Sequence, residues 1–140
     1  IKTIDRDLIV DGILQSYLLS AYSARKLWMS PTGHGGGVHN LFVNPGNLDQ
    51  SALLKQLGTG LWVTELMGQG INLVTGDYSR GASGFWVQDG EVQYPVHEIT
   101  IAGNLKKMFE NIIAIGNDVD ERRNIRTGSV LIERMTVGGE

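Results

Sequence analysis

The distribution of glycine constrains the fold of this chain more than any other feature of its sequence. Nineteen glycines are spread over 140 residues without a fixed period, and only three prolines accompany them. They cluster between apolar segments, which argues against a collagen-like or disordered chain. Because glycine tolerates positive φ angles and has no Cβ, we expect many tight turns and close approaches between backbone segments.

Two Asp-Gly pairs predict β-hairpins, because such a pair supplies the positive φ angles of a type I′ turn. Asp11-Gly12 and Asp89-Gly90 each stand between two apolar segments. The flanking segments are residues 7–10 and 13–17 for the first pair, and residues 84–88 and 91–96 for the second. Pro95 has no N–H to donate, so we expect it at a sheet edge or a bulge. Further strands are predicted at residues 39–43, 61–66 and 129–132.

Two segments carry helix signals. Asn104 can cap a helix whose apolar residues recur at i, i+3, i+4, i+7 and i+8, and Gly116 would end it. The apolar face of this helix would be Leu105, Met108, Phe109, Ile112 and Ile113. A shorter helix is predicted at about residues 49–57, with Asn47 or Asp49 as its N-cap.

These elements predict one small α+β domain over residues 1–140, or a fragment of one, with a β-rich, antiparallel, twisted sheet and about two helices on one face. The net charge of −3 gives no general attraction to nucleic acid or to an anionic membrane. No apolar run approaches the roughly 20 residues that span a bilayer. The chain opens at Ile1 without an initiator Met, and we interpret this start as a cut.

Metal and hydrolase motifs are incomplete in this sequence. His34 opens a His-Gly-Gly-Gly run of the kind that forms oxyanion holes, but no Gly-x-Ser-x-Gly nucleophile elbow accompanies it. His97-Glu98 begins like a His-Glu-x-x-His zinc motif, yet Ile101 stands where the second histidine belongs. With three histidines and no cysteine, a zinc site made by this chain alone is not expected.

The most informative stretch runs from Glu65 to Trp86 and interleaves glycines with polar side chains. The residues alone leave two interpretations open. Its backbone and side chains bind an extended peptide or a partner loop, or its polar residues satisfy their own turns. The residues of this stretch predicted to contact such a peptide or partner are Gly68, Gln69, Gly70, Asn72, Thr75, Asp77, Tyr78, Ser79 and Arg80. Arg80 could hold a peptide carboxylate with its planar donors, or pair with Asp77.

The same stretch resembles a signature segment of the PmbA (TldE) branch of the TldD/PmbA metallopeptidase family. The resemblance covers nearly the whole chain in order, which makes it more specific than any short motif. It rests on residues 67–86, 94–105, 115–118 and 127–130, and upstream on residues 17–27 and 39–41. It implies the C-terminal domain of a PmbA/TldE-like protein.

The resemblance implies a cytoplasmic protein that works in a TldD–TldE pair as a zinc metallopeptidase on unfolded or extended peptides, such as microcin precursors and antitoxins. An older family label is modulator of DNA gyrase. In such pairs the TldD-type subunit carries a His-Glu-x-x-x-His motif and a C-terminal cysteine for the zinc, and the TldE-type subunit helps to enclose the substrate channel.

The absence of cysteine places this chain on the TldE side of that division. The resemblance then implies no catalytic residue and no metal on this chain, zinc in a TldD-like partner, and an extended peptide as substrate. It also implies that the candidate residues between Gly68 and Arg80 line the substrate channel or contact the partner. Self-association remains open. Two alternatives also remain open: a self-sufficient metallopeptidase with zinc ligands further upstream, and a peptide- or protein-binding module without a proteolytic role.

Overall fold

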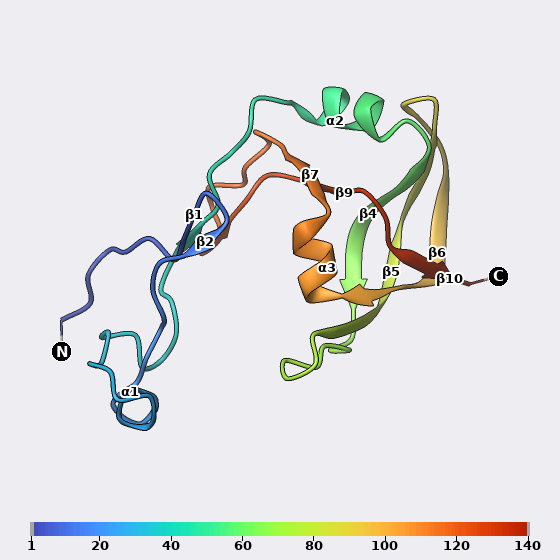
Figure 1. Ribbon diagram of the computed structural model, residues 1–140. Coiled ribbons are helices and arrows are strands. Elements are labelled where there is room, and N and C mark those ends of the chain that lie inside the picture. The colour runs from blue at the N-terminus through green and yellow to red at the C-terminus, as the bar shows by residue number, and fades with distance from the viewer. Residues whose placement is uncertain (1, 140) are drawn as a thin grey trace. The chain divides into compact units, whose positions relative to one another are not determined.

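A computed structural model describes residues 2–139 of the chain (Figure 1). The chain divides into two compact units, the first reaching to Leu41 and the second beginning at Phe42. No helix in the described part has the length and apolar character that a membrane crossing requires.

The first unit begins with the hairpin that the sequence predicts. β1 (Ile9–Val10) pairs in antiparallel fashion with β2 (Ile13–Leu14), although both strands are shorter than expected. Asp11 and Gly12 between them have φ angles of 51° and 76°. These values match the two positive φ angles of a type I′ turn, and the prediction is confirmed.

A short helix that the sequence did not predict follows the hairpin. α1 (Ala21–Lys26) starts with a capping box, in which Ser20 and Ser23 bond each other's backbone N–H groups. A pair of hydrogen bonds holds the flanking segment: the Leu19 N–H donates to Thr32 Oγ1 (2.8 Å), and the Thr32 N–H donates to the Leu19 carbonyl (3.2 Å). Six residues are too few for a clear apolar period, so only the caps signal this helix.

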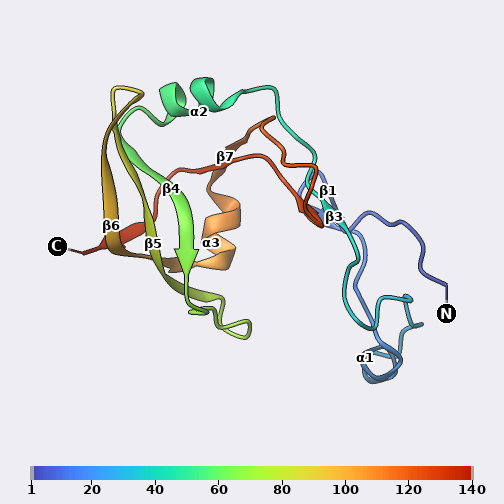
Figure 2. The same cartoon turned by 180° about the vertical axis from the view of Figure 1, so that it is seen from behind.

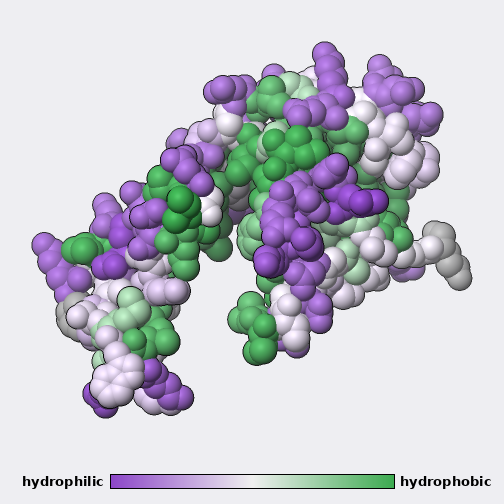
Figure 3. All heavy atoms as spheres, in the orientation of Figure 1, coloured by the Kyte–Doolittle hydropathy of each residue, from purple (hydrophilic) through white to green (hydrophobic). Residues whose placement is uncertain are grey.

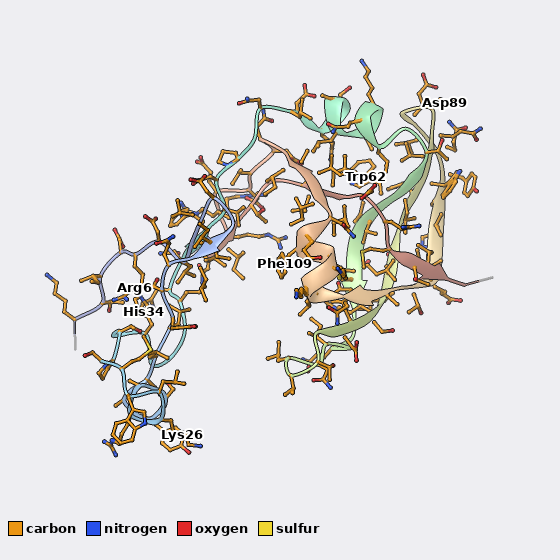
Figure 4. The ribbon with its side chains drawn as sticks, in the orientation of Figure 1. Arg6, Lys26, His34, Trp62, Asp89 and Phe109 are labelled. Atoms are coloured by element: carbon orange, nitrogen blue, oxygen red, sulfur yellow. The ribbon has the colours of Figure 1, made fainter. Side chains whose placement is uncertain are left out.

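The second unit is built on a four-stranded antiparallel sheet with the strand order β10-β6-β5-β4. The strands are β4 (Gly60–Met67), β5 (Asp77–Gln88), β6 (Glu91–Asn104) and β10 (Thr136–Gly138). Asp89 and Gly90 join β5 to β6 with φ angles of 53° and 77°, and Figure 4 labels Asp89 at this turn. The second predicted hairpin is therefore confirmed, and β4 forms one edge of the sheet.

Pro95, which has no N–H to donate, lies in a part of β6 that has a neighbouring strand on one side only. It stands in β6 opposite Phe85 of β5, in a part of β6 that β10 does not reach. The register between β5 and β6 then shifts just beyond it, where Glu98 has a φ of 52°. The prediction of an edge or bulge position is confirmed.

The core of the second unit lies on one face of this sheet. Tyr78 and Ala82 of β5 and Ile99 and Ile101 of β6 are buried together, because alternate residues of a strand share a face. α3 (Leu105–Glu110) packs against them on the same face, as both views of the ribbon show (Figures 1 and 2). This is the β-rich α+β architecture that the sequence predicts, with three short helices in the described residues instead of two.

The remaining elements are one helix and four short strands. α2 (Gln50–Leu57) is capped by Asp49, whose side chain accepts from the Ala52 N–H, and it ends at Gly58 as predicted. Leu53 is its buried residue. The short strands are β3 (Leu41–Phe42), β7 (Ile112–Ile115), β8 (Ile125–Arg126) and β9 (Val130–Ile132). The predicted strands at residues 61–66 and 129–132 are found, whereas that at 39–43 shrinks to two residues.

The predicted long helix after Asn104 is wrong in its second half. Asn104 does cap α3, since its side chain accepts from the Lys106 N–H, but the helix ends at Glu110. Ile112 and Ile113 belong to β7, which pairs with β9. β-Branched residues favour a strand where a partner is available, and the apolar period over residues 105–113 could not show that partner.

Candidate functional site

The segment between β4 and β5 forms a hollow at the end of the sheet. Its volume is about 340 Å³. It is lined by Gln69, Gly70, Ile71, Asn72, Asp77, Tyr78 and Ser79. Six of these seven residues belong to the nine that the sequence singles out, so the candidate residues come together around one concave surface.

Two glycines allow the chain to close this hollow. Gly68 has a φ of 79° and turns the chain at the end of β4. At Gly70 a Cβ would overlap the carbonyl oxygen of Ser79, so only glycine fits this approach. The Ser79 N–H donates to the Gly70 carbonyl (2.7 Å), and an isolated bridge joins Ile71 to Tyr78. The segment therefore folds back onto the first residues of β5.

Three of the polar candidates hold the loop together. The Asn72 side-chain oxygen accepts from the N–H groups of Val74 (2.9 Å) and Thr75 (3.2 Å). Thr75 Oγ1 donates to Asp77 Oδ2 (2.9 Å). The Asn104 side-chain amide, from the end of β6, donates to the Thr75 carbonyl (3.0 Å). Asn72, Thr75 and Asp77 thus satisfy their own turn, and they fix the shape of the hollow.

Gln69 and Ser79 have side chains free for a ligand. Within residues 2–139, neither side chain makes a hydrogen bond, and both line the hollow. Each can donate and accept hydrogen bonds. Tyr78 differs, because it is buried in the core and presents little of its surface.

Arg80 lies on the core face of β5 rather than beside Asp77. It stands opposite Ile101 in the register, and a strand places residues three apart on opposite faces. Among the described residues it forms no ion pair with Asp77, and its Nε is buried without a hydrogen-bond partner. The Arg80–Asp77 pairing considered from the sequence is therefore not formed.

The tip of the same loop presents two apolar side chains to solvent. Leu73 and Val74 are 87% and 95% exposed. In Figure 3 this loop, at the lower end of the sheet, ends in a hydrophobic group coloured green. Because the hydrogen bonds of Asn72 and Thr75 fix the turn, the tip is held in one shape despite its exposure.

A second, larger concavity lies on the core face of the sheet. It has a volume of about 540 Å³, and its lining is mainly apolar, with Leu53 and Leu57 of α2, Trp62 of β4 and Met108 of α3 among its residues. Trp62 also packs on Phe85, with ring centroids 5.7 Å apart. Figure 4 labels Trp62 on β4. Polar residues also border this cavity, namely Gln50, Thr59, Ser129, Glu133 and Arg134.

The side chains of residues 2–139 form no cluster of the kind that binds zinc. Nowhere in the described part of the chain do three histidine, cysteine or carboxylate side chains gather as metal ligands do. The segment at residues 117–129 is held by Asp118, which accepts from the N–H (2.8 Å) and Oγ (2.5 Å) of Ser129. Partial burial raises the pKa of Asp118, but these hydrogen bonds outweigh it and lower the pKa.

The whole chain matches one family of known proteins. The family model of the PmbA/TldA metallopeptidase C-terminal domain matches residues 1–139. The metalloprotease PmbA of Escherichia coli is 57% identical over 140 residues, which are 100% of this chain and 31% of that protein. A metalloprotease TldD homologue of Buchnera aphidicola is more distant, at 23% identity over 94% of this chain and 32% of that protein.

Solved structures agree with this match. A protein of Thermotoga maritima described as a modulator of a DNA gyrase superposes with a TM-score of 0.88 at 35% identity, over 99% of this chain and 34% of that one. A protein of Bacteroides thetaiotaomicron described as a modulator of DNA gyrase gives a TM-score of 0.90 at 30% identity, over 99% of this chain and 31% of that one. This chain spans about a third of the length of its relatives. From its sequence and its fold alike, the chain belongs to the PmbA/TldD metallopeptidase family, as a C-terminal domain.

Proposed function

We propose that this chain belongs to the non-zinc subunit of a TldD–PmbA type zinc metallopeptidase, which acts in the cytoplasm on unfolded peptides. In this proposal the zinc resides in a TldD-like partner subunit, and the segment from Gly68 to Arg80 forms part of the wall of the peptide channel. Family membership over the full length of the chain supports the enzyme class.

The hollow between β4 and β5 is the observation that carries the proposed role in peptide binding. It lies where the edge strand β4 ends, and an edge strand presents unpaired N–H and C=O groups along its outer side. An extended peptide can pair with such an edge through backbone hydrogen bonds, which do not depend on the peptide's sequence. Gln69 and Ser79 in the hollow then offer side-chain hydrogen bonds to the same peptide.

This chain would bind and orient the peptide rather than cleave it. When bound in the partner, zinc would supply the polarised water that attacks the peptide bond. The loop of Asn72, Thr75 and Asp77 keeps its shape through its own hydrogen bonds, so it requires no reorganisation when a peptide arrives. A preformed surface binds with less loss of conformational entropy.

Zinc content and reconstituted activity test which subunit holds the zinc and whether both subunits are needed for cleavage. The full-length gene product is purified alone without chelator, and its zinc is measured by plasma mass spectrometry. We expect negligible zinc, and no cleavage of a fluorescently labelled unfolded peptide until the TldD-like subunit of the same organism is added. Near-stoichiometric zinc with cleavage by this subunit alone would favour a self-sufficient peptidase. Peptide binding without any cleavage in the mixture would favour a binding module.

The peptide-binding role of the hollow has its own test. In the reconstituted enzyme, the double variant Gln69→Ala and Ser79→Ala should raise KM about tenfold, since each lost hydrogen bond is worth about 0.5–1.5 kcal/mol. Gln93→Ala on β6 removes a similar exposed side chain away from the hollow and serves as the control. An unchanged KM in the double variant would remove these two side chains from the binding surface.

A further inference from the structure

The two hairpin turns of this chain share a dipeptide whose backbone can rearrange in water alone. The sequence contains two Asp-Gly pairs, Asp11-Gly12 and Asp89-Gly90, and no Asn-Gly pair. In an Asp-Gly pair the backbone nitrogen of glycine can attack the aspartate side chain, because glycine has no Cβ that obstructs the approach. Both pairs lie in turns with two positive φ angles, so their surroundings decide which of them reacts.

The reaction is an isomerisation of the backbone, described here for the first pair. The Gly12 nitrogen forms a bond to Asp11 Cγ and gives up its proton, and the carboxyl oxygen leaves as water, which produces a five-membered succinimide ring. Water then adds to one of the two ring carbonyls. When the ring opens at the α-carbonyl, the chain continues through Cγ and Asp11 has become isoaspartate, with its α-carboxylate as the side chain. One water is released and one is consumed, so mass and charge are unchanged.

Ring closure requires the turn to open first. A type I′ turn holds both residues at the φ and ψ angles that pair the flanking strands. The peptide plane between aspartate and glycine must rotate before the nitrogen faces Cγ, and this rotation breaks the strand pairing. Segments of one protein open with very different free energies. An Asp-Gly turn that opens easily should therefore isomerise, and one that is held closed should not.

Asp89-Gly90 is held closed by three features. The Gly90 N–H donates to the Gly58 carbonyl (2.8 Å), so the attacking nitrogen is already engaged. A Cβ on Gly90 would lie 3.0 Å from the Lys55 Cα, so this turn also packs closely against α2. The turn joins the 12 residues of β5 to the 14 residues of β6, which Figure 1 shows as long paired ribbons. Opening this turn disturbs the main sheet.

Asp11-Gly12 lacks all three features. Among the described residues, the Gly12 N–H donates no hydrogen bond, and a Cβ on Gly12 would have no atom within 4 Å. β1 and β2 have two residues each. Two further hydrogen bonds, donated by the Gln15 N–H (2.7 Å) and by Ser16 Oγ (2.6 Å), extend their pairing. A two-stranded hairpin of this length is marginally stable, so its turn opens readily.

We propose that Asp11 is a site of spontaneous conversion to isoaspartate and that the fold protects Asp89 from the same reaction. The modification adds one backbone carbon to the two-residue turn. The register that places Ile9 opposite Leu14 and Val10 opposite Ile13 is then lost. The new α-carboxylate is the group that an isoaspartyl carboxyl methyltransferase recognises, so the modified chain is a substrate for that class of enzyme.

Peptide mapping of the aged full-length gene product tests this inference. The folded protein is kept for several weeks at neutral pH and physiological temperature and is then digested with trypsin. Asp11 is released in residues 7–25 and Asp89 in residues 81–106, so the two sites are measured separately. Electron-transfer fragmentation distinguishes the two backbone linkages. Isoaspartate should form at least about tenfold faster at Asp11 than at Asp89, because the shorter hairpin opens more often. Equal rates, or no isoaspartate at Asp11, would overturn the proposal.

Two controls separate the fold from the local sequence. In guanidinium chloride both turns are absent, and the rates at Asp11 and Asp89 should become similar. If the folded-state difference persists there, the flanking residues cause it and the protection of Asp89 by the fold is wrong. Asp11→Gly leaves a Gly-Gly pair, which a type I′ turn also accepts, and removes the carboxyl. Isoaspartate should then disappear from residues 7–25, whereas a signal that remains would come from Asp7 and refute the assignment to Asp11.

Discussion

Replacing Gly70 by alanine tests whether a close backbone approach really shapes the hollow. A Cβ at this position overlaps the Ser79 carbonyl oxygen, which is backbone of β5 and cannot swing aside. The loop must therefore separate from Ser79, and the bond from the Ser79 N–H to the Gly70 carbonyl (2.7 Å) is lost. That bond is worth about 1 kcal/mol, and the forced displacement costs a further 1–3 kcal/mol or so. We expect Gly70→Ala to lower the free energy of unfolding by about 2–4 kcal/mol.

Urea denaturation of the 140-residue chain measures this loss. With a slope near 2 kcal/mol per molar urea, the midpoint should fall by roughly 1–2 M. Gly36→Ala is the matched control, since no atom lies within 4 Å of its added Cβ and its φ is not positive. It should change stability little, or raise it by up to about 1 kcal/mol by restricting the unfolded chain. If Gly70→Ala unfolds within about 0.5 kcal/mol of the wild type, the close approach at Ser79 is wrong.

Three further predictions concern stability and ionisation. Trp28→Gly should raise the free energy of unfolding by about 1 kcal/mol, because it removes a non-glycine residue with a positive φ of 55° without losing buried surface. A lower urea midpoint would contradict backbone strain at Trp28. Leu53→Ala, at the buried position of α2, should lower the free energy of unfolding by about 2–3 kcal/mol in the same assay. A change under about 1 kcal/mol would mean that the Leu53 side chain is not packed. The hydrogen bond from the Arg122 side chain lowers the pKa of Asp120 from 3.8 to about 2. The hydrogen-bonded ion pair of Asp120 and Arg122 should therefore be fully formed above about pH 4 and be lost as the pH falls through 2. An NMR titration of the Asp120 carboxyl with a midpoint near 3.8 would contradict this prediction.

Local signals in the sequence were sufficient wherever a few adjacent residues decide the structure. The two Asp-Gly turns have the predicted positive φ angles, and Asp49 and Asn104 cap the helices that they were expected to cap. These predictions succeed because turn and cap geometry depends on side chains within three or four residues. The family resemblance, which uses the whole chain, is confirmed by the match over residues 1–139.

Structure that depends on residues distant in the sequence could not be predicted from such local signals. The apolar period of residues 105–113 predicted one helix, yet Ile112 and Ile113 belong to β7, which pairs with β9, about twenty residues further along. Arg80 and Asp77 were considered as an ion pair, yet the strand places them on opposite faces. The short α1 was missed because its capping box has a serine at the third helical position instead of the usual glutamate or glutamine.

The sequence by itself determined the turns, the caps, the α+β class and the family of this chain. Only the tertiary structure decided which polar residues of the candidate segment are free to bind. Asn72, Thr75 and Asp77 have the same polar character in the sequence as Gln69 and Ser79, but their hydrogen bonds are used within the loop. Those bonds join residues two or three positions apart, but the turn that makes them is held by the Asn104 side chain, which donates to the Thr75 carbonyl. Asn104 comes within reach of this turn only because β6 pairs with β5, where Asn104 lies opposite Asp77.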